Sequence, residues 1–271
     1  MQNLKEIIYA GSIVVLTGLL DDKINLSPNI KLLSVSIPTL YLATAGFGVT
    51  DLGNYEYIGT VSLGKFYFIF TVLSVGLLTN SYNYIDGIDG LLTSLTITSL
   101  IYVSLLVSDS LIVDFIIFAV IALVINMIFN FLPKTNNYKI FAGNSGSLFV
   151  GFFISFLIIY LYKFKNIHPA YLIWICWYPV YDFLYVTFYR TINKKLFYIA
   201  DNNHFHHAIF NFYKKSHLKT TLFINSINII VIFSGYQICK NFGELFSITA
   251  FFILFIFFCI IRRKKIKQKF K

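Results

Sequence analysis

Long runs of apolar residues, separated by short polar stretches, dominate the chain from end to end. Nine runs are long enough to predict membrane helices, because a backbone in hydrocarbon must satisfy its own hydrogen bonds. They cover residues 4–20, 30–49, 62–79, 91–107, 111–131, 147–162, 169–189, 221–238 and 245–261. No repeat or long linker interrupts them, so residues 1–271 are expected to form one all-α membrane helix bundle.

The composition supports a membrane protein. The chain is 57% hydrophobic and 13% charged, with a mean hydropathy of +0.72. Soluble domains carry about a quarter charged residues, and a water-soluble chain of this composition would expose large apolar patches. The first run is followed by Asp21-Asp22, and no signal-peptide cleavage site is evident. The three cysteines lie in or beside apolar segments without metal-ligand spacing, which indicates packing.

The basic residues are distributed unevenly between the two sides of the predicted bundle. One side carries 17 of the 22 Lys and Arg residues, including seven in the segment 262–271. Basic residues favour the cytoplasmic side of membrane proteins, so this side is predicted to be cytoplasmic. The N-terminus is then outside and the basic tail inside, near anionic lipid head groups. The same rule explains the net charge of +10 without nucleic acid as a partner.

Polar residues collect in four clusters, all on the predicted cytoplasmic side. The last of them lies in the longest loop, residues 190–220. The clusters are Asp21-Asp22 with Asn25, and the stretches 80–90, 130–147 and 201–207. Because the topology was predicted from Lys and Arg alone, the shared location of acids, amides and histidines is independent support for a functional site there.

Four of the twelve acidic residues, Asp21, Asp22, Asp86 and Asp89, belong to the first two clusters. Asp and Asn also cap helices and turn chains, so each cluster by itself has a structural explanation. Carboxylates crowded on one face would, however, repel one another without a cation. Mg²⁺ suits such a site, because it binds one or two carboxylates and leaves positions for water and substrate phosphates.

Three further features have alternative interpretations. The segment 143–147 opens a span, where backbone N–H groups can bind phosphate, although most Gly/Ser segments are only turns. His204, His206 and His207 are not spaced as three zinc ligands on one helical face, so contact with a pyrophosphate or leaving group is favoured. Asp182 lies within an apolar span, where an acid is either functional or paired with a tyrosine or a neighbouring backbone.

In their order, these clusters resemble the polyprenyl-phosphate N-acetylhexosamine-1-phosphate transferases, in particular the bacterial undecaprenyl-phosphate GlcNAc-1-phosphate transferases. The resemblance covers residues 18–211. Its motifs are Gly18-Leu-Leu-Asp21-Asp22, Asn80-x-x-Asn83-x-x-Asp86-Gly-Ile-Asp89-Gly-Leu91, Phe129-Asn130 … Pro133 … Tyr138-Lys-Ile-Phe141-Ala-Gly143-Asn144-Ser-Gly146-Ser147, Pro179-x-x-Asp182 … Arg190 and Ala200-Asp201-x-x-His204-x-His206-His207.

The resemblance implies an activity, a location and partners. Such enzymes transfer a sugar 1-phosphate from a UDP-N-acetylhexosamine to undecaprenyl phosphate with Mg²⁺ or Mn²⁺, and they release UMP. The reaction starts a cell-surface glycan such as O-antigen, common antigen or teichoic acid. It implies a multi-pass protein of the bacterial inner membrane with a cytoplasmic active site, and it leaves a homodimer open.

The resemblance also implies roles for single residues. Asp21 and Asp22 would face the lipid phosphate, one of them helping to deprotonate it, and Asp86 and Asp89 complete the catalytic acids. Metal ligands would come from Asp22, Asp86 and Asn144. Substrate contacts would come from Asn83, Asn130, Phe141, Arg190, His204, His206 and His207, with Phe141 near the uracil.

Two departures from the family pattern suggest a second hypothesis. Asn144 stands where relatives carry an aspartate metal ligand, and the chain begins at what resembles the third of eleven spans. An impaired family member that only binds nucleotide sugar or a partner is therefore the alternative. An ion-coupled transporter, which would require acids near the bilayer midplane and inverted repeats, is disfavoured.

Overall fold

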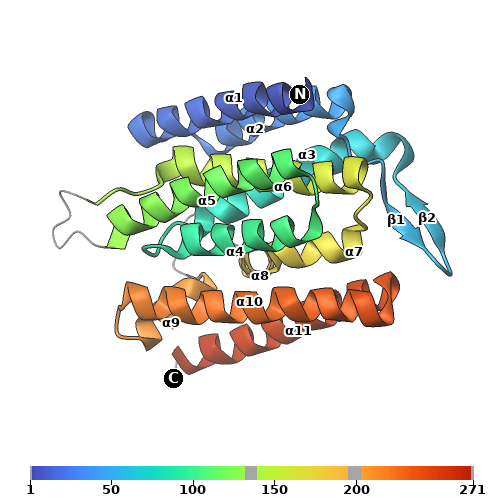
Figure 1. The fold of residues 1–271 in the computed structure, drawn as a ribbon. Helices are drawn as coiled ribbons and strands as arrows, with labels where there is room; N and C mark the ends of the chain where they lie inside the picture. The colour runs from blue at the N-terminus through green and yellow to red at the C-terminus, as the bar shows by residue number, and fades with distance from the viewer. Residues whose placement is uncertain (1, 132–138, 195–202, 270–271) are drawn as a thin grey trace.

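The computed structural model describes residues 2–131, 139–194 and 203–269, and these form a bundle of helices roughly along one axis (Figure 1). The long helices are α1 (Gln2–Ile24), α2 (Pro28–Leu42), α3 (Tyr67–Ile85), α4 (Leu91–Leu106), α5 (Ser110–Phe131), α6 (Gly143–Lys165), α8 (Trp177–Ile192), α10 (His217–Phe242) and α11 (Glu244–Lys269). Short helices α7 (Pro169–Leu172) and α9 (Phe205–Phe212) and a hairpin of β1 (Asp51–Tyr55) and β2 (Gly59–Ser62) complete the described elements. The predicted all-α membrane bundle is confirmed.

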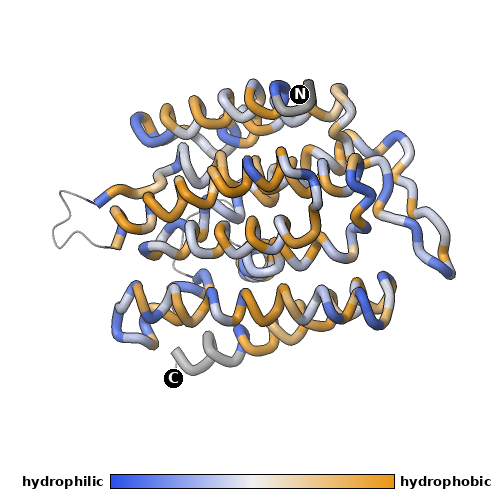
Figure 2. The backbone as a smooth tube through the Cα atoms, viewed as in Figure 1, coloured by the Kyte–Doolittle hydropathy of each residue, from blue (hydrophilic) through white to orange (hydrophobic). Residues whose placement is uncertain are grey.

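Every predicted span falls on helical structure, and five described helical segments are long and apolar enough to cross a membrane. These five are Asn29–Phe47, Ser110–Phe131, Gly143–Lys165, His217–Phe242 and Glu244–Arg263. Helix α4 is also apolar but is shorter. Figure 2 shows that apolar residues continue along most of each helix and that hydrophilic residues gather towards the helix ends.

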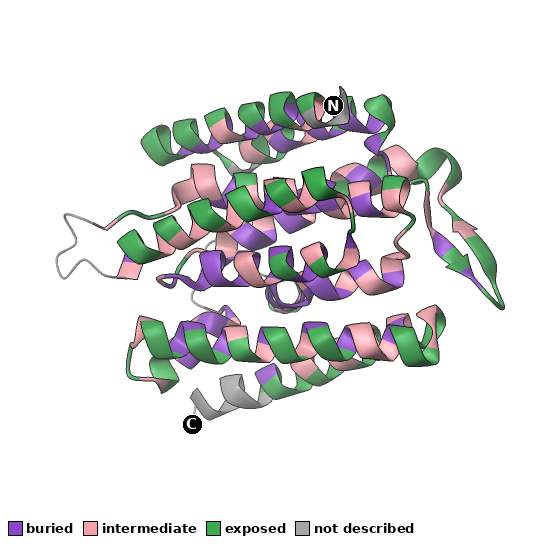
Figure 3. Cartoon of the chain, viewed as in Figure 1, coloured by how far each residue is buried: buried purple, intermediate pink, exposed green. Residues whose placement is uncertain are grey.

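The outer helices expose apolar side chains. Most of α5 and α11 is exposed or half-buried (Figure 3), although both helices are strongly apolar. Phe118, for example, is 73% exposed on α5, and Ile253 is 61% exposed on α11. Apolar surface of this extent is unfavourable in water and favourable against lipid. These faces therefore contact hydrocarbon.

The bundle has two chemically different ends. At one end, called here the polar end, lie the C-terminal ends of α1, α3, α5 and α8 (Figure 1). At the other, called the hairpin end, lie the β1–β2 hairpin and the connection between α10 and α11. Those parts of the four predicted polar clusters that the structure describes all lie at the polar end.

The predicted span 169–189 is not one helix, which corrects that expectation. It consists of α7, a 3₁₀ turn at Ile173–Cys176 and then α8. Pro179 explains the break, because it has no N–H to donate to the carbonyl of Ile175 four residues earlier. That carbonyl instead accepts a hydrogen bond from the Ser99 hydroxyl of α4 at 3.0 Å. A neighbouring helix thus satisfies the freed backbone group.

The hairpin was not predicted, because its strands are short and weakly apolar. His168, which precedes α7, fixes it to the bundle. The Nε2 atom of His168 lies 3.1 Å from the Asn54 carbonyl, and its Nδ1 accepts from the Ala170 N–H at 3.2 Å. The ring also packs edge-on against Tyr55, with 5.0 Å between centroids. Contacts remote in sequence therefore stabilise a hairpin that local propensity does not specify.

Helix α6 joins the two apolar cores of the bundle. One core lies among α1, α2, α3 and α6 and includes Val14 and Phe152. The other is built mainly from α3, α4, α6, α8 and α10 and includes Leu95 and Ile154. At the polar end, α1 approaches α6 so closely that a Cβ on Gly18 would overlap the backbone of Ser145. Glycine at this position permits the contact.

We expect Gly18→Ala to lower the thermal unfolding temperature of the purified protein in detergent. The new methyl group has only the Ser145 backbone to displace, so α1 must move away from α6. Alanine favours an isolated helix over glycine by about 1 kcal/mol, so a loss of stability identifies the steric contact. Gly76→Ala is the matched control, since its Cβ would meet its nearest neighbour at 3.6 Å. Equal melting temperatures for both variants would contradict the prediction.

Candidate active site

The loop between α3 and α4 forms the centre of the polar end. It carries Asp86, Gly87, Ile88 and Asp89, directly after the last turn of α3. Asn83, in the last turn of α3, donates through its side-chain nitrogen to Oδ1 of Asn144 and to Oγ of Ser147, both at 2.8 Å. The second and third polar clusters are therefore joined by direct hydrogen bonds.

Asp22 joins the first cluster to the same network. Its carboxylate accepts the backbone N–H of Asn144 at 2.9 Å and that of Ser145 at 3.4 Å. The N-terminal amides of α6, which the sequence suggested as a phosphate site, thus bind a carboxylate of the chain itself. An acid at this position is stabilised by the orphan N–H groups and the helix dipole.

Asp86 is electrostatically coupled to two neighbouring acids. Burial is the largest cause that raises its pKa to about 7, and the charges of Asp22 and Asp89 raise it further. These three predicted site residues therefore lie close enough to repel one another. Such an arrangement favours any ligand that brings positive charge.

Asp21 points to a different environment from Asp22. Its side chain is buried, and it accepts from the Leu26 N–H at 2.8 Å and pairs with Lys31 at 2.6 Å. The expectation that Asp21 lies with the other three aspartates around one site is therefore not supported by its contacts. Neighbouring residues of a helix point about 100° apart, so Asp21 and Asp22 cannot share one face.

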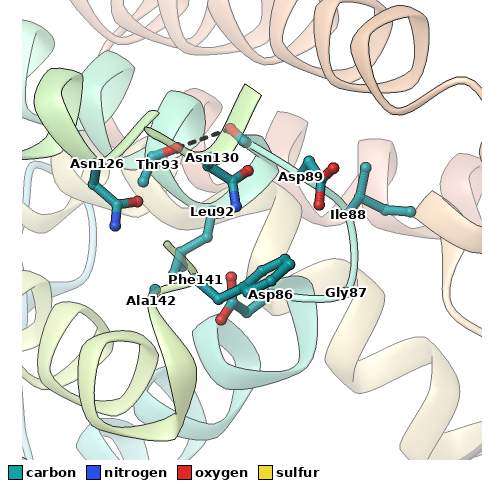
Figure 4. A pocket seen from close by; sticks show the side chains of 11 residues that line it. Asp86, Gly87, Ile88, Asp89, Leu92, Thr93, Asn126, Asn130, Phe141 and Ala142 are labelled. Atoms are coloured by element: carbon teal, nitrogen blue, oxygen red, sulfur yellow. Dashed lines mark hydrogen bonds between the residues drawn. The ribbon is translucent and has the colours of Figure 1, made fainter. Parts of the chain in front are cut away.

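A cavity of about 60 Å³ opens beside the α3–α4 loop (Figure 4). The loop residues form one wall, and α5 and the segment before α6 form the other. Asn126, Asn130, Phe141 and Ala142 line the second wall. Asn130 is buried and donates to the Ile140 carbonyl at 3.1 Å, while its Oδ1 has no hydrogen-bond partner among the described residues. Sequence analysis singled out Asn130 and missed Asn126, one helical turn earlier.

The histidine cluster is anchored by Asp182. The carboxylate of Asp182 accepts from Nδ1 of His204 at 2.8 Å and from the Phe205 N–H at 2.7 Å. The sequence left two interpretations of Asp182 open, a functional acid or an acid paired with a neighbouring group. Asp182 is 3% exposed, and its partners lie at the start of the short helix α9. Because the carboxylate can only accept, His204 carries a proton on Nδ1.

Arg262 secures the same segment from α11. It was expected in a basic tail at the membrane surface, but its side chain is buried. Its guanidinium donates to the Asn203 carbonyl and lies over the rings of Tyr185 and Phe205, 5.2 and 5.6 Å from their centroids. The first residue of the predicted tail is therefore part of the site's support.

His206 and His207 lie against the α3–α4 loop. A Cβ on Gly87 would be within 3.6 Å of both rings. His206 is fully buried, and burial is the largest cause that lowers its pKa to about 3. His206 is therefore neutral at physiological pH. The fourth cluster thus reaches the second, next to Asp86.

The other predicted residues are a buried arginine and residues outside the described ranges. Arg190 is buried near the end of α8, and Asp201, Pro133 and Tyr138 lie outside the described residues. Sequence analysis did not single out Lys139, which pairs with Asp89 at 2.7 Å. Within the described ranges, no three His, Cys, Asp or Glu side chains are arranged to hold a metal ion.

Comparisons with known proteins identify similar chains. Residues 5–162 match the profile of glycosyl transferase family 4. A probable undecaprenyl-phosphate N-acetylglucosaminyl 1-phosphate transferase of Bacillus subtilis is 31% identical over 96% of this chain and 73% of its own length. Undecaprenyl-phosphate α-N-acetylglucosaminyl 1-phosphate transferases of Yersinia pestis and Escherichia coli K12 are 29% and 28% identical over 73% of this chain. The chain spans 56% of the length of these two relatives.

We expect Asp86→Asn to stabilise the cation-free protein, by more at pH 8 than at pH 5. As pH falls through about 7 the native carboxyl binds a proton, whereas the unfolded one does so only near 3.8. As pH falls from about 7 to 3.8, proton binding by the native carboxyl therefore stabilises the folded state. Above about pH 7 the native carboxyl is charged, and the folded state carries the full free-energy cost of this buried charge. Thermal unfolding in EDTA at both pH values measures the effect.

The matched control for this prediction is Glu56→Gln, which removes an exposed acid at the hairpin end. It should leave the melting temperature nearly unchanged at both pH values. A stabilisation by Asp86→Asn that does not depend on pH would contradict the assigned cause.

Proposed function

The chain belongs to glycosyl transferase family 4, and we propose that it transfers N-acetylglucosamine 1-phosphate from UDP-GlcNAc to undecaprenyl phosphate. UMP is the second product, and the lipid-linked sugar starts a cell-surface glycan. The observation that carries the proposal is the junction of Asp22, Asn83, Asp86 and Asn144 beside a cavity at the polar end.

The cavity beside the α3–α4 loop suits the uridine of the donor. Phe141 offers an aromatic face, and Asn126 and Asn130 place two amides on the same wall. A uracil ring presents one N–H between two carbonyl groups, which side-chain amides can match. The unpartnered Oδ1 of Asn130 is an acceptor for that N–H. We assign the base to this wall and the phosphates to the side of Asp86.

The acidic side chains fit a divalent cation better than they fit one another. Burial, followed by the charges of Asp22 and Asp89, raises the pKa of Asp86, and a bound cation would offset the cost of its negative charge. Asp22, Asp86 and the Asn144 carbonyl oxygen are the groups that would hold Mg²⁺ or Mn²⁺, with water and substrate phosphates completing the shell. When bound, the cation offsets the charge that develops on the diphosphate during transfer.

In the proposed reaction, an oxygen of the lipid phosphate attacks the β-phosphorus of UDP-GlcNAc. A new P–O bond forms there, the bond to the bridging oxygen breaks, and UMP leaves with that oxygen. Of the two adjacent aspartates, Asp22 is exposed towards the network, so we assign it to the lipid phosphate. Asp21 maintains the turn after α1 through Leu26 and Lys31. Positioning of two substrates supplies much of such a rate enhancement.

The histidines complete the proposed site on the side of Gly87. His206 is neutral there and cannot offset phosphate charge as a cation. Asp182 holds His204 through Nδ1, and we assign the other ring nitrogen, Nε2, to a hydrogen bond with a phosphate or sugar group. The distribution of basic residues supports our assignment of this end of the bundle to the cytoplasmic face of the plasma membrane, where UDP-sugars and the carrier phosphate would meet.

The proposed activity predicts a lipid-linked product in membranes supplied with radiolabelled UDP-GlcNAc and undecaprenyl phosphate. Extraction and chromatography of the lipid fraction measure it, and omission of Mg²⁺ should abolish it. Protein that is folded and embedded in the membrane but forms no such product with Mg²⁺ present would refute the proposal.

Asn144 makes an impaired enzyme the second candidate, because its oxygen already accepts from Asn83. Asn144→Asp should lower the Mg²⁺ concentration for half-maximal activity by on the order of 10-fold, since one added charge can contribute about 1.4 kcal/mol. Asn54→Asp at the hairpin end adds the same charge as a control. Activity that appears only with Asn144→Asp would favour the impaired enzyme.

A further inference from the structure

Both backbone polar groups of Asp89 are bound by side chains of α10. The Asp89 N–H donates to Nδ1 of His217 at 3.0 Å, and the Thr221 hydroxyl donates to the Asp89 carbonyl at 2.8 Å. His217 is the first residue of α10 and Thr221 lies one turn later, so both side chains share one helix face. One helix face thus contacts both sides of a single residue in the α3–α4 loop.

This loop needs support from outside itself. Asp89 lies between two helices, and Gly90 adopts a left-handed φ of 71° to begin α4. Backbone groups that no helix satisfies must find other partners when they are removed from water. Phe131 also packs where a side chain on Gly90 would stand, which leaves the turn little freedom. The two hydrogen bonds from α10 therefore determine where the Asp89 peptide lies.

The position of the peptide determines the position of the carboxylate. Asp89 lines the cavity assigned to the uridine, and its Oδ2 pairs with Lys139 at 2.7 Å. A shift of the backbone would move this carboxylate relative to Phe141 and Asn130 on the opposite wall. A bound nucleotide between the walls would then lose contact with one of them.

The imidazole of His217 has a defined role in this arrangement. Because its Nδ1 accepts the Asp89 N–H, that nitrogen carries a lone pair, and the neutral ring carries its proton on Nε2. The Phe210 ring packs against the imidazole, with 4.6 Å between centroids, and helps to orient it. The essential feature is thus an acceptor at the Nδ1 position, which an asparagine side chain reproduces and a glutamine side chain does not.

We infer that His217 and Thr221 are positioning residues that hold Asp89 at the nucleotide cavity. The inference rests on the proposed function, because it assigns that cavity to the uridine of UDP-GlcNAc. Neither residue touches the cavity, so both act through the Asp89 peptide. Their loss should weaken nucleotide binding and raise KM for UDP-GlcNAc, with a smaller effect on kcat at saturating substrate.

The threonine provides the cleaner test. Thr221→Val preserves shape and removes the donor, so we expect the Kd for UMP to rise by about 3- to 10-fold, as for one lost neutral hydrogen bond. Thr221→Ser keeps the hydroxyl and should stay near the wild type. Thr220→Val is the matched control, because the Thr220 hydroxyl donates to the carbonyl of Ser216, the residue that caps α10, at 2.8 Å and is not bonded to Asp89.

The histidine provides an independent pattern. His217→Ala and His217→Gln should both raise KM for UDP-GlcNAc and the Kd for UMP, whereas His217→Asn should restore most of the binding. A merely structural role would lower the amount of folded protein and the melting temperature without separating asparagine from glutamine. If the histidine variants fail to fold, the comparison of Thr221→Val with Thr220→Val decides the question.

The outcomes separate this inference from the proposed function. If the wild type neither binds UMP nor forms lipid-linked product, the proposed function fails and the inference fails with it. If the wild type does both, and Thr221→Val binds UMP as well as Thr220→Val does, the inference alone is overturned. Weaker binding by Thr221→Val, His217→Ala and His217→Gln, with recovery in Thr221→Ser and His217→Asn, supports it.

Discussion

The contact between α1 and the N-terminus of α6 is the interaction on which the site depends. Gly18 allows the two helices to approach until backbone meets backbone, and Asp22, one turn later on the same helix face, then reaches the amides of Asn144 and Ser145. The carboxylate satisfies N–H groups that α6 cannot satisfy itself. Because Asp22 binds the backbone N–H of Asn144, it also fixes the position of the Asn144 side chain, which accepts a hydrogen bond from the side-chain nitrogen of Asn83. The close packing of α1 against α6 thus determines where the Asp22 carboxylate lies in the candidate site.

Three further polar groups of the helices are satisfied by other parts of the chain, as an environment of lipid favours. Asp182 on α8 is satisfied by the first residues of α9, and Arg262 on α11 by the Asn203 carbonyl just before them. The carbonyl of Ile175, freed by a proline, is satisfied by α4. Each of these contacts joins two helices or a helix and a neighbouring segment, and those of Asp182 and Arg262 also position the histidines of the candidate site.

The helical spans and the gathering of the polar clusters at one end of the bundle could be predicted from the sequence, because both depend on local information. An apolar run specifies a helix in hydrocarbon wherever it occurs, and loop charge specifies its direction. The burial of Arg262, the orientation of Asp21 away from Asp22's network and the contacts of His217 depend instead on which helices become neighbours. The sequence around a basic residue that follows an apolar run does not indicate whether the side chain faces lipid head groups or, as Arg262 does, two aromatic rings. The hairpin escaped prediction for the same reason, since His168 holds it from more than a hundred residues away.

The four aspartates have different electrostatic environments, and this difference explains where added positive charge would act. Asp21 and Asp89 each pair with a lysine, and Asp22 faces helix amides. Asp86 has no ion pair among the described residues and has the raised pKa. Asp86, beside the histidines and the cavity, is therefore the carboxyl group whose negative charge is least compensated. Asparagine at position 144 reduces the negative charge of the site by one unit relative to an aspartate there, while keeping an oxygen towards Asn83. A cation at such a site would depend more on the phosphates of its substrates than on the protein, so cation and nucleotide should bind cooperatively.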